Sequence, residues 1–329
     1  MTTSLMSRQR RSDYIEETVE INGIRQYFLH VPSPGKPVIL HLHGGPGQSQ
    51  AHFAYCTRAQ RDYCTFVYYD QRGAGKTQQR SKTPVGEITL DNLIEDLRQT
   101  IVYVKERYQT DEVVLLGHSW GSVLGTSYIL RYPNDVKGYI GVGQVVSMQK
   151  GERLGYDKLK ETVENKGNRR DIKRVEGLSG YFTDIGLKDF MRQIGQIRSL
   201  QGKYDLVAKT PRTLKTVLKS PIFRAGDIAS FLTAFQVNKN LFDGLLGYDI
   251  LSVNDYQTPV CYVLGEKDWL VPSVLAAEYF ETIDAPVKQL HWVKNAGHLT
   301  DLDNPQGFHE AVSACMQALC TCVLQQTSG

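Results

Sequence analysis

Apolar and polar positions alternate along residues 14–31 in two runs that meet at Asn22-Gly23. Asn-Gly between two alternating runs is the strongest short signal for a β-hairpin. Six later runs are almost continuously apolar, as strands covered on both faces are: 37–42, 65–70, 112–117, 139–146, 259–265 and 287–293. The pattern therefore predicts eight strands, of which the first two are antiparallel.

Between most of these runs, apolar residues recur with the spacing of an α-helix, in the segments 91–108, 122–132, 273–283 and 305–323. Asp91 and Asn304-Pro305 are typical of helix starts. Strands that alternate with helices predict a mostly parallel eight-stranded sheet with helices on both faces. The expected fold class is α/β.

The alternation stops in residues 147–256. Helical patterns dominate there, for example at 157–166, 187–201 and 227–246. Such an insertion predicts a helical cap over the C-terminal edge of the sheet, where open α/β sheets bind ligands. We therefore expect a mobile tail at residues 1–13 and a cap at residues 147–256. The core is expected in two pieces, residues 14–146 and 257–329.

The cap is more positive than the rest of the chain. It carries 19 Lys or Arg and 13 Asp or Glu, whereas the whole chain has a net charge of only +3. Two interpretations of this excess stay open: it attracts an anionic substrate, or it belongs to solvated helix surfaces. The small total charge and the lack of basic stretches interleaved with aromatic residues argue against nucleic-acid binding.

Gly117-x-Ser119-x-Gly121 stands directly between a predicted strand and a predicted helix. In that context the pattern is typical of a nucleophile elbow, a sharp turn that lifts a serine hydroxyl clear of the sheet. The glycines let the neighbouring strand and helix approach the turn, and the helix presents its positive end to the serine. The motif predicts Ser119 as a nucleophile.

Serine needs a general base at neutral pH, and the base needs an acid that orients it. Asp268 follows the strand predicted over 259–265, and His298 follows the strand predicted over 287–293. All three residues lie beyond the C-terminal ends of different strands, so they share one edge of the sheet. We predict that Ser119, Asp268 and His298 form a catalytic triad.

Acyl transfer also needs N–H donors that hold the negative oxygen of the tetrahedral intermediate. The N–H of the residue after the nucleophile, Trp120, is one expected donor. The other is expected from Gly45, in the loop HGGPG that follows the third predicted strand. Supporting residues are expected on both sides of the site: His43, Gly44, Gly117 and Gly121.

A glycine-rich loop after a strand also suits a phosphate, but the phosphate motifs are incomplete. The P-loop pattern that ends at residues 75–77 has Asp70 in place of its first glycine. The dinucleotide pattern that begins at Gly45 has Gln50 in place of its third glycine. His41 and His43 suggest a metal pair, but no third ligand has a supporting spacing. We therefore expect no cofactor and no metal.

Five short segments together resemble the α/β-hydrolase superfamily, and more narrowly its proline iminopeptidase branch. They are HGGPG at 43–47, DQRGAGKT at 70–77, GHSWGS at 117–122, GEKD at 265–268 and NAGH at 295–298. The order Ser, Asp, His along the chain is also that of the superfamily. The resemblance implies an α/β-hydrolase fold with an inserted cap, the triad named above, and Gly45 and Trp120 as oxyanion donors.

The cap departs from the iminopeptidase pattern. Members of that branch typically carry two tryptophans followed by a glutamate in the cap, and cap glutamates bind the substrate's free amino group. Here the three tryptophans lie outside the cap, at positions 120, 269 and 292. The four cap glutamates lie in its first third: Glu152, Glu161, Glu164 and Glu176. Glycine is also more common in that branch where this chain has His118.

We expect a cofactor-independent serine hydrolase that acts on a small molecule or short peptide. An iminopeptidase-like aminopeptidase is the first candidate, and a carboxylesterase or amidase is the second. A ligand-binding protein that keeps a hydrolase fold is a third alternative, against which the complete triad argues. No run approaches the roughly 18 apolar residues of a membrane span, and the polar N-terminus does not resemble a signal peptide. A cytoplasmic protein without a membrane partner is therefore expected.

Overall fold

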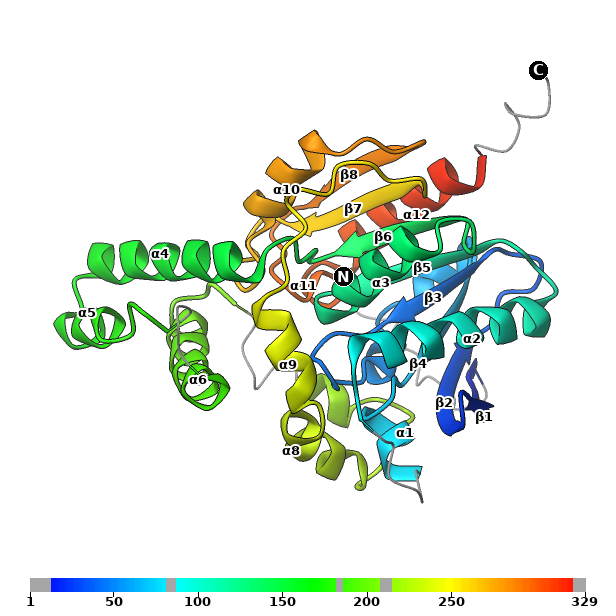
Figure 1. The fold of residues 1–329 in the computed structure, drawn as a ribbon, viewed down its shortest axis with the longest axis horizontal. Helices are drawn as coiled ribbons and strands as arrows, with labels where there is room; N and C mark the ends of the chain where they lie inside the picture. The colour runs from blue at the N-terminus through cyan, green and yellow to red at the C-terminus, as the bar shows by residue number, and fades with distance from the viewer. Residues whose placement is uncertain (1–12, 81–86, 182–185, 208–214, 322–329) are drawn as a thin grey trace, which may run out of the picture.

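The computed structural model describes residues 13–80, 87–181, 186–207 and 215–321, so the predicted tail lies outside the described residues except for Asp13. Eight strands form one sheet in the order β1-β2-β4-β3-β5-β6-β7-β8 (Figure 1). Their bounds are β1 Ile15–Ile21, β2 Ile24–Val31, β3 Val38–Leu42, β4 Thr65–Tyr69, β5 Val113–His118, β6 Gly138–Val142, β7 Val260–Gly265 and β8 Lys288–Val293. The β1–β2 and β2–β4 pairs are antiparallel and the others parallel, which confirms the predicted sheet.

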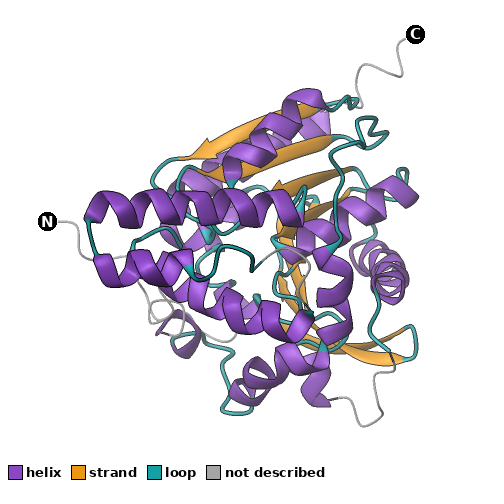
Figure 2. Ribbon diagram, turned by 60° about the vertical axis from the view of Figure 1, so that its left-hand side comes forward, coloured by secondary structure: helices purple, strands orange, loops and turns teal. Residues whose placement is uncertain are grey.

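Helices cover both faces of the sheet (Figure 2). Buried residues of α2 (Leu90–Tyr108), α3 (Trp120–Arg131) and α10 (Ser273–Thr282) form one core with Val38 and Leu40 of β3. Residues of α12 (Pro305–Thr321) form the other core with Ile39. Successive β3 residues enter opposite cores because strand side chains alternate between the two faces.

Local signals determine several element ends. Asn22 and Gly23 have φ angles of 46° and 74°, both in the left-handed region that a type I′ hairpin turn requires, and they join β1 to β2. The helix predicted from Asp91 begins at Leu90, because the Thr89 side chain accepts a hydrogen bond from the Asn92 N–H and caps it.

Two predicted elements are shorter than expected. The strand predicted over 139–146 ends at Val142, because Gly143 has a φ of 54° and turns the chain out of the sheet. The helix predicted over 227–246 is two helices, α8 (Asp227–Val237) and α9 (Lys239–Leu246). They are separated by Asn238, whose side-chain amide donates to the carbonyls of Ala234 (2.8 Å) and Gly73 (2.9 Å).

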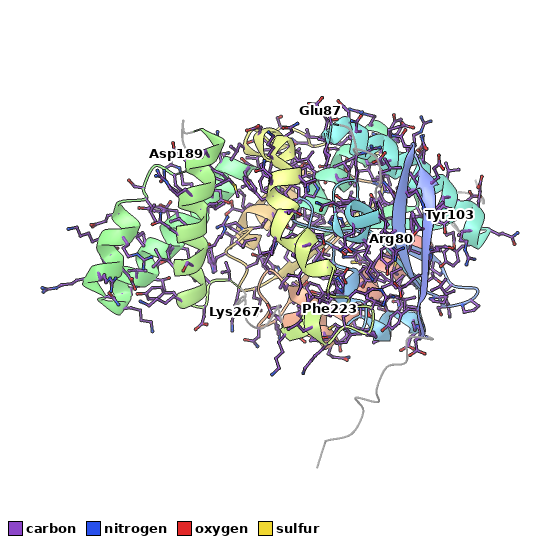
Figure 3. The ribbon with its side chains drawn as sticks, turned by 90° about the horizontal axis from the view of Figure 1, so that it is seen from below. Arg80, Glu87, Tyr103, Asp189, Phe223 and Lys267 are labelled. Carbon is purple, nitrogen blue, oxygen red and sulfur yellow. The ribbon has the colours of Figure 1, made fainter. Side chains whose placement is uncertain are left out.

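The described residues between β6 and β7 are dominated by helices, as expected for the cap. Besides α8 and α9 they include α4 (Met148–Lys166), α5 (Arg169–Glu176) and α6 (Leu187–Lys203). Helices α4, α5 and α6 extend beyond one side of the sheet (Figure 1). Asp189 of α6 and Tyr103 of α2 accordingly lie towards opposite sides of the molecule (Figure 3). No described helix is long and apolar enough to cross a membrane.

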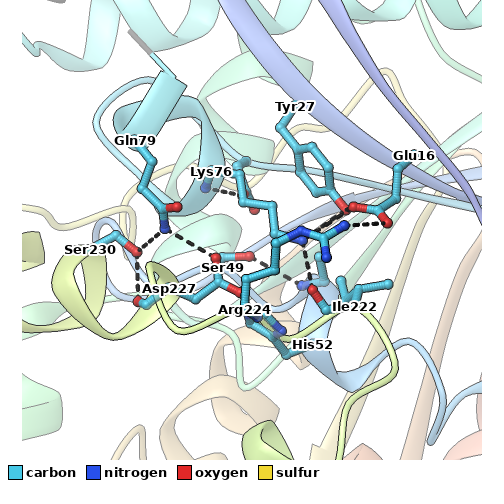
Figure 4. Close-up of polar contacts among 12 residues, drawn as sticks. Glu16, Tyr27, Ser49, His52, Lys76, Gln79, Ile222, Arg224, Asp227 and Ser230 are labelled. Atoms are coloured by element: carbon cyan, nitrogen blue, oxygen red, sulfur yellow. Dashed lines mark hydrogen bonds and ion pairs between the residues drawn. The ribbon is translucent and has the colours of Figure 1, made fainter.

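A buried polar network joins α8 to the core (Figure 4). One carboxylate oxygen of Asp227 accepts a hydrogen bond from Gln79 at 3.1 Å, and the other lies 3.5 Å from Nε2 of His52. The Lys76 ammonium donates to the carbonyl of Ile222 at 2.9 Å. Because Asp227, His52 and Lys76 are buried, these contacts fasten α8 and the segment before it to the core.

Buried histidines make the fold sensitive to acid. Burial lowers the pKa of His30, His43 and His52 to about 4. It lowers the pKa of His118 to about 3 and that of His41 well below its ordinary value. In the unfolded chain each takes up a proton near its ordinary pKa of about 6.5, whereas the folded protein does so only at lower pH. Folding therefore opposes protonation between these values.

We predict that the free energy of unfolding decreases as the pH falls from about 6.5 towards 4, because the unfolded chain binds protons on these histidines that the folded protein does not bind. Burial raises the pKa of Asp70 and of Asp301 to about 6, so these two carboxyls offset part of the loss below that pH. Urea denaturation at several pH values measures the slope. A stability that stays constant or increases over this range would contradict the prediction.

Candidate active site

Ser119 occupies the sharp turn between β5 and α3. Its φ and ψ of 55° and −121° are unusual for a residue with a side chain, and its N–H donates to the carbonyl of Val142 at 3.0 Å. A Cβ atom at Gly121 would lie 2.0 Å from the Leu42 carbonyl oxygen, and one at Gly117 would lie 2.5 Å from the Gly121 carbonyl oxygen. The turn therefore needs glycine at both positions, as the motif predicts.

Asp268 follows β7 and His298 follows β8, and the structure brings them together. Nδ1 of His298 donates to one carboxylate oxygen of Asp268 at 2.8 Å. The other oxygen accepts the N–H groups of Leu270 and Val271, both at 3.0 Å. These contacts keep the proton of His298 on Nδ1 and leave Nε2 without it. Both side chains are buried, with 3% of Asp268 and 8% of His298 exposed.

The loop at residues 43–47 packs directly against the serine, and His43 holds it in place. A Cβ atom at Gly44 would lie 3.2 Å from Cβ of Ser119. Nε2 of His43 accepts the N–H of Gln71 at 3.0 Å, so Nδ1 carries the proton and donates to the Gly44 carbonyl at 2.9 Å. The side chain of Gln71 also donates to the His43 carbonyl at 3.1 Å. Burial lowers the pKa of His43 to about 4, so the ring stays neutral and supports the loop.

His118 links this loop to the loop that carries His298. The Gly44 N–H donates to the side-chain oxygen of Gln50 at 3.0 Å, so the amide nitrogen of Gln50 donates to Nδ1 of His118, also at 3.0 Å. Nε2 of His118 then donates to the backbone carbonyl of His298 at 2.8 Å. Burial and the neighbouring His298 lower the pKa of His118 to about 3, which keeps this ring neutral.

Sequence reasoning missed the roles of Gln50 and His118. Gln50 entered only as a mismatch to a dinucleotide pattern, and His118 only as a departure from the iminopeptidase branch. No local pattern reveals their contact, because the two residues are 68 positions apart along the chain. Gln71 was missed for the same reason. Its side chain accepts the indole N–H of Trp120, which is 49 positions away along the chain, at 3.2 Å.

A cavity of about 980 Å³ lies between the core and the cap, and both Ser119 and His298 line it. Gly44, Gly45 and Trp120 line it as well, whereas Asp268 lies behind His298. Of all the Lys and Arg residues that the structure describes in the cap, Arg198 alone lines this cavity. The positive charge of the cap is therefore spread mainly over other surfaces, which favours the interpretation of solvated helix faces.

The described residues include no group of three or more His, Cys, Asp or Glu side chains placed to hold a metal ion. The ring of His41 lies against Phe66 and Tyr68, with ring centroids 5.9 Å and 4.9 Å away. His41 is thus part of the core, and His43 is occupied by the loop contacts described above.

Comparison with known proteins agrees with this geometry. A family model described as "alpha/beta hydrolase fold" matches residues 37–305. "Probable aminopeptidase YbaC" of Bacillus subtilis (strain 168) is 25% identical over 319 residues, which cover 94% of this chain and 98% of the relative. A proline iminopeptidase of Heyndrickxia coagulans is 25% identical over 306 residues, which cover 90% of this chain and 96% of the relative.

A solved structure shows the same fold. The proline iminopeptidase-related protein TTHA1809 from Thermus thermophilus superimposes with a TM-score of 0.64 at 20% identity. The match covers 93% of this chain and 98% of that protein. The similarity extends over the sheet and the inserted helices, since so little of either chain is left out.

The close approach at Gly121 leads to a test of the turn. We predict that Gly121→Ala lowers the free energy of unfolding by about 3 kcal/mol, because the added methyl group meets the backbone of Leu42 and cannot be accommodated by a side-chain movement. The matched control is Gly244→Ala in α9, where a Cβ atom meets nothing within 4 Å. This control should raise the stability by up to about 1 kcal/mol. Equal effects of the two substitutions in urea denaturation would refute the role assigned to Gly121.

Proposed function

Since the chain belongs to the alpha/beta hydrolase fold family and is a hydrolase related to the proline iminopeptidases, we propose that it works as a serine hydrolase. In this proposal Ser119 is the nucleophile, His298 the general base and Asp268 the orienting acid. One observation carries the proposal: the 2.8 Å hydrogen bond from His298 to Asp268 beside a serine held in a left-handed turn on the wall of the same cavity.

The proposed reaction passes through an acyl-enzyme. Nε2 of His298 removes the proton of the Ser119 hydroxyl as the oxygen attacks the substrate carbonyl carbon. His298 then gives this proton to the leaving group, and the bond between the carbonyl carbon and the leaving group breaks. A water molecule, deprotonated by His298, then attacks the acyl carbon. The bond from this carbon to the Ser119 oxygen breaks, His298 returns the proton to that oxygen, and the acid leaves. Asp268 stabilises the charged His298 ring in both stages.

We assign the oxyanion hole to the N–H groups of Gly45 and Trp120. Two observations support this assignment. Both residues line the cavity beside Ser119, and the neighbouring N–H of Gly44 is already bonded to Gln50. An oxyanion donor contributes roughly 3 kcal/mol to stabilising the transition state, because it is held in place before the charge develops.

Two substrate classes suit this chemistry. The names of the relatives support an iminopeptidase-like aminopeptidase that acts on a small amide or short peptide. A carboxylesterase or amidase is the second candidate, and the apolar character of the cavity wall favours it: Phe190, Phe231, Phe235, Phe242 and Leu245 all line the cavity. In both cases one part of the substrate, either the acyl group or the leaving group, lies in the cavity beneath the cap.

We predict that a fluorophosphonate probe labels the protein and that Ser119→Ala abolishes the labelling, because the activated hydroxyl is the atom that attacks phosphorus. Ser199→Ala is the matched control, since Ser199 lines the same cavity but is not assigned a catalytic role. This control should be labelled at the wild-type rate. Well-folded protein that is not labelled would instead favour a ligand-binding protein with a hydrolase fold.

We also predict that Asp268→Asn lowers kcat by about 10⁴-fold. The N–H groups of Leu270 and Val271 require an acceptor, so the asparagine turns its amide nitrogen towards His298. Nδ1 of His298 must then accept, its proton moves to Nε2, and the base is lost. Hydrolysis of a nitrophenyl ester measures kcat, and circular dichroism checks the fold. A folded variant that keeps kcat within about tenfold of the wild type would exclude this role.

A further inference from the structure

The charged side chains on the cavity wall neutralise each other. Of the described residues that line the cavity, two are charged Asp, Glu, Lys or Arg residues: Glu152 of α4 and Arg198 of α6. These two form an ion pair. The remaining wall contributed by α6, α8 and α9 is mainly apolar, with residues such as Phe190, Ile194 and Phe235. The wall that the described residues form therefore carries no net charge apart from that of any protonated histidine.

Both carboxylate oxygens of Glu152 are already engaged. One oxygen accepts a hydrogen bond from Arg198, and the other accepts one from the hydroxyl of Tyr181. Only 4% of Glu152 is exposed, and Arg198 also donates to the side chain of Gln201 at 2.8 Å. Burial, reinforced by Glu152, raises the pKa of Tyr181 above its ordinary value, so its hydroxyl stays protonated and continues to donate.

The other cap glutamates do not supply a carboxylate to the cavity. Glu161 and Glu164 are paired with Lys158 and Lys160 on α4, with 59% and 49% of their side chains exposed. Glu176 is exposed at the end of α5. An ammonium group that approached Glu152 would therefore share the carboxylate with Arg198, whose positive charge, on a side chain that is 23% exposed, already offsets the negative one.

We propose that the cavity binds an uncharged, apolar acyl group and does not select substrates with a free α-amine. This inference rests on the proposed serine hydrolase function, and it selects the ester and amide class over the aminopeptidase class. The neutralised ion pair gives no energetic advantage to a cation, whereas the apolar wall gains free energy from every methylene group that leaves water.

Two substrate series test the proposal in the wild-type protein. With nitrophenyl acetate, butyrate and hexanoate, kcat/KM should rise by about fourfold for each added methylene group, which corresponds to about 0.8 kcal/mol. With alanyl-naphthylamide and its N-acetylated form, kcat/KM of the acetylated compound should equal or exceed that of the free amine. A free amine favoured by about tenfold or more, the effect of an ammonium bonded to a carboxylate, would overturn the proposal.

Variants of the ion pair provide a second test. Glu152→Gln leaves the positive charge of Arg198 unbalanced, so it should lower the ratio of kcat/KM values for the free and acetylated naphthylamides by about tenfold. Arg198→Met should release Glu152 and raise the relative rate of the free amine by about tenfold. The double variant Arg198→Met with Glu152→Gln should remove that gain. A ratio in the double variant at least tenfold below that of the wild type would refute the proposal, because it would show that the Glu152 carboxylate recognises the amine.

Fluorophosphonate labelling of Ser119 separates the two levels of failure. If the probe does not label folded protein and no ester is hydrolysed, the serine hydrolase function itself is wrong. If the probe labels Ser119 and esters are hydrolysed, but free amines are strongly preferred, only the assignment of the cavity to an uncharged acyl group is wrong.

Discussion

The arrangement of the site depends on one close contact, in which the backbone of Gly121 lies against the carbonyl of Leu42. This contact brings the start of α3 to the end of β3, so Ser119 lies directly beside the loop that begins at His43. Any side chain at Gly121 would push the two elements apart. Backbone packing therefore brings the serine turn and the glycine-rich loop together.

Two neutral histidines extend this arrangement to the neighbouring loops. His43 connects residues 43–47 with Gln71, and His118 connects Gln50 with the carbonyl of His298. Each ring has one partner that can only donate and one that can only accept, so the position of its proton is determined. Burial disfavours the charged form of both rings, and this keeps the hydrogen bonds in one pattern.

The cap contributes polar contacts of two kinds. Those around Asp227 and Lys76 face the core and hold the cap in position. Those of Glu152 face the cavity, but they are satisfied within the cap by Arg198 and Tyr181. In both places a buried carboxylate, of Asp227 or Glu152, has hydrogen-bonding partners, because an unpaired charge removed from water would destabilise the fold by several kcal/mol. What remains available to a ligand is largely apolar surface.

The sequence by itself determined the features that depend on neighbouring residues. Alternation and Asn22-Gly23 predict the hairpin, and Gly117 and Gly121 predict the sharp turn at Ser119, because backbone conformation follows local sterics. The break at Asn238, the bridge from Gln50 to His118, and the pairing of Glu152 with Arg198 were decided by the tertiary structure. Each depends on a partner distant in sequence, from 46 to 165 positions away, and such partners meet only when the chain is folded.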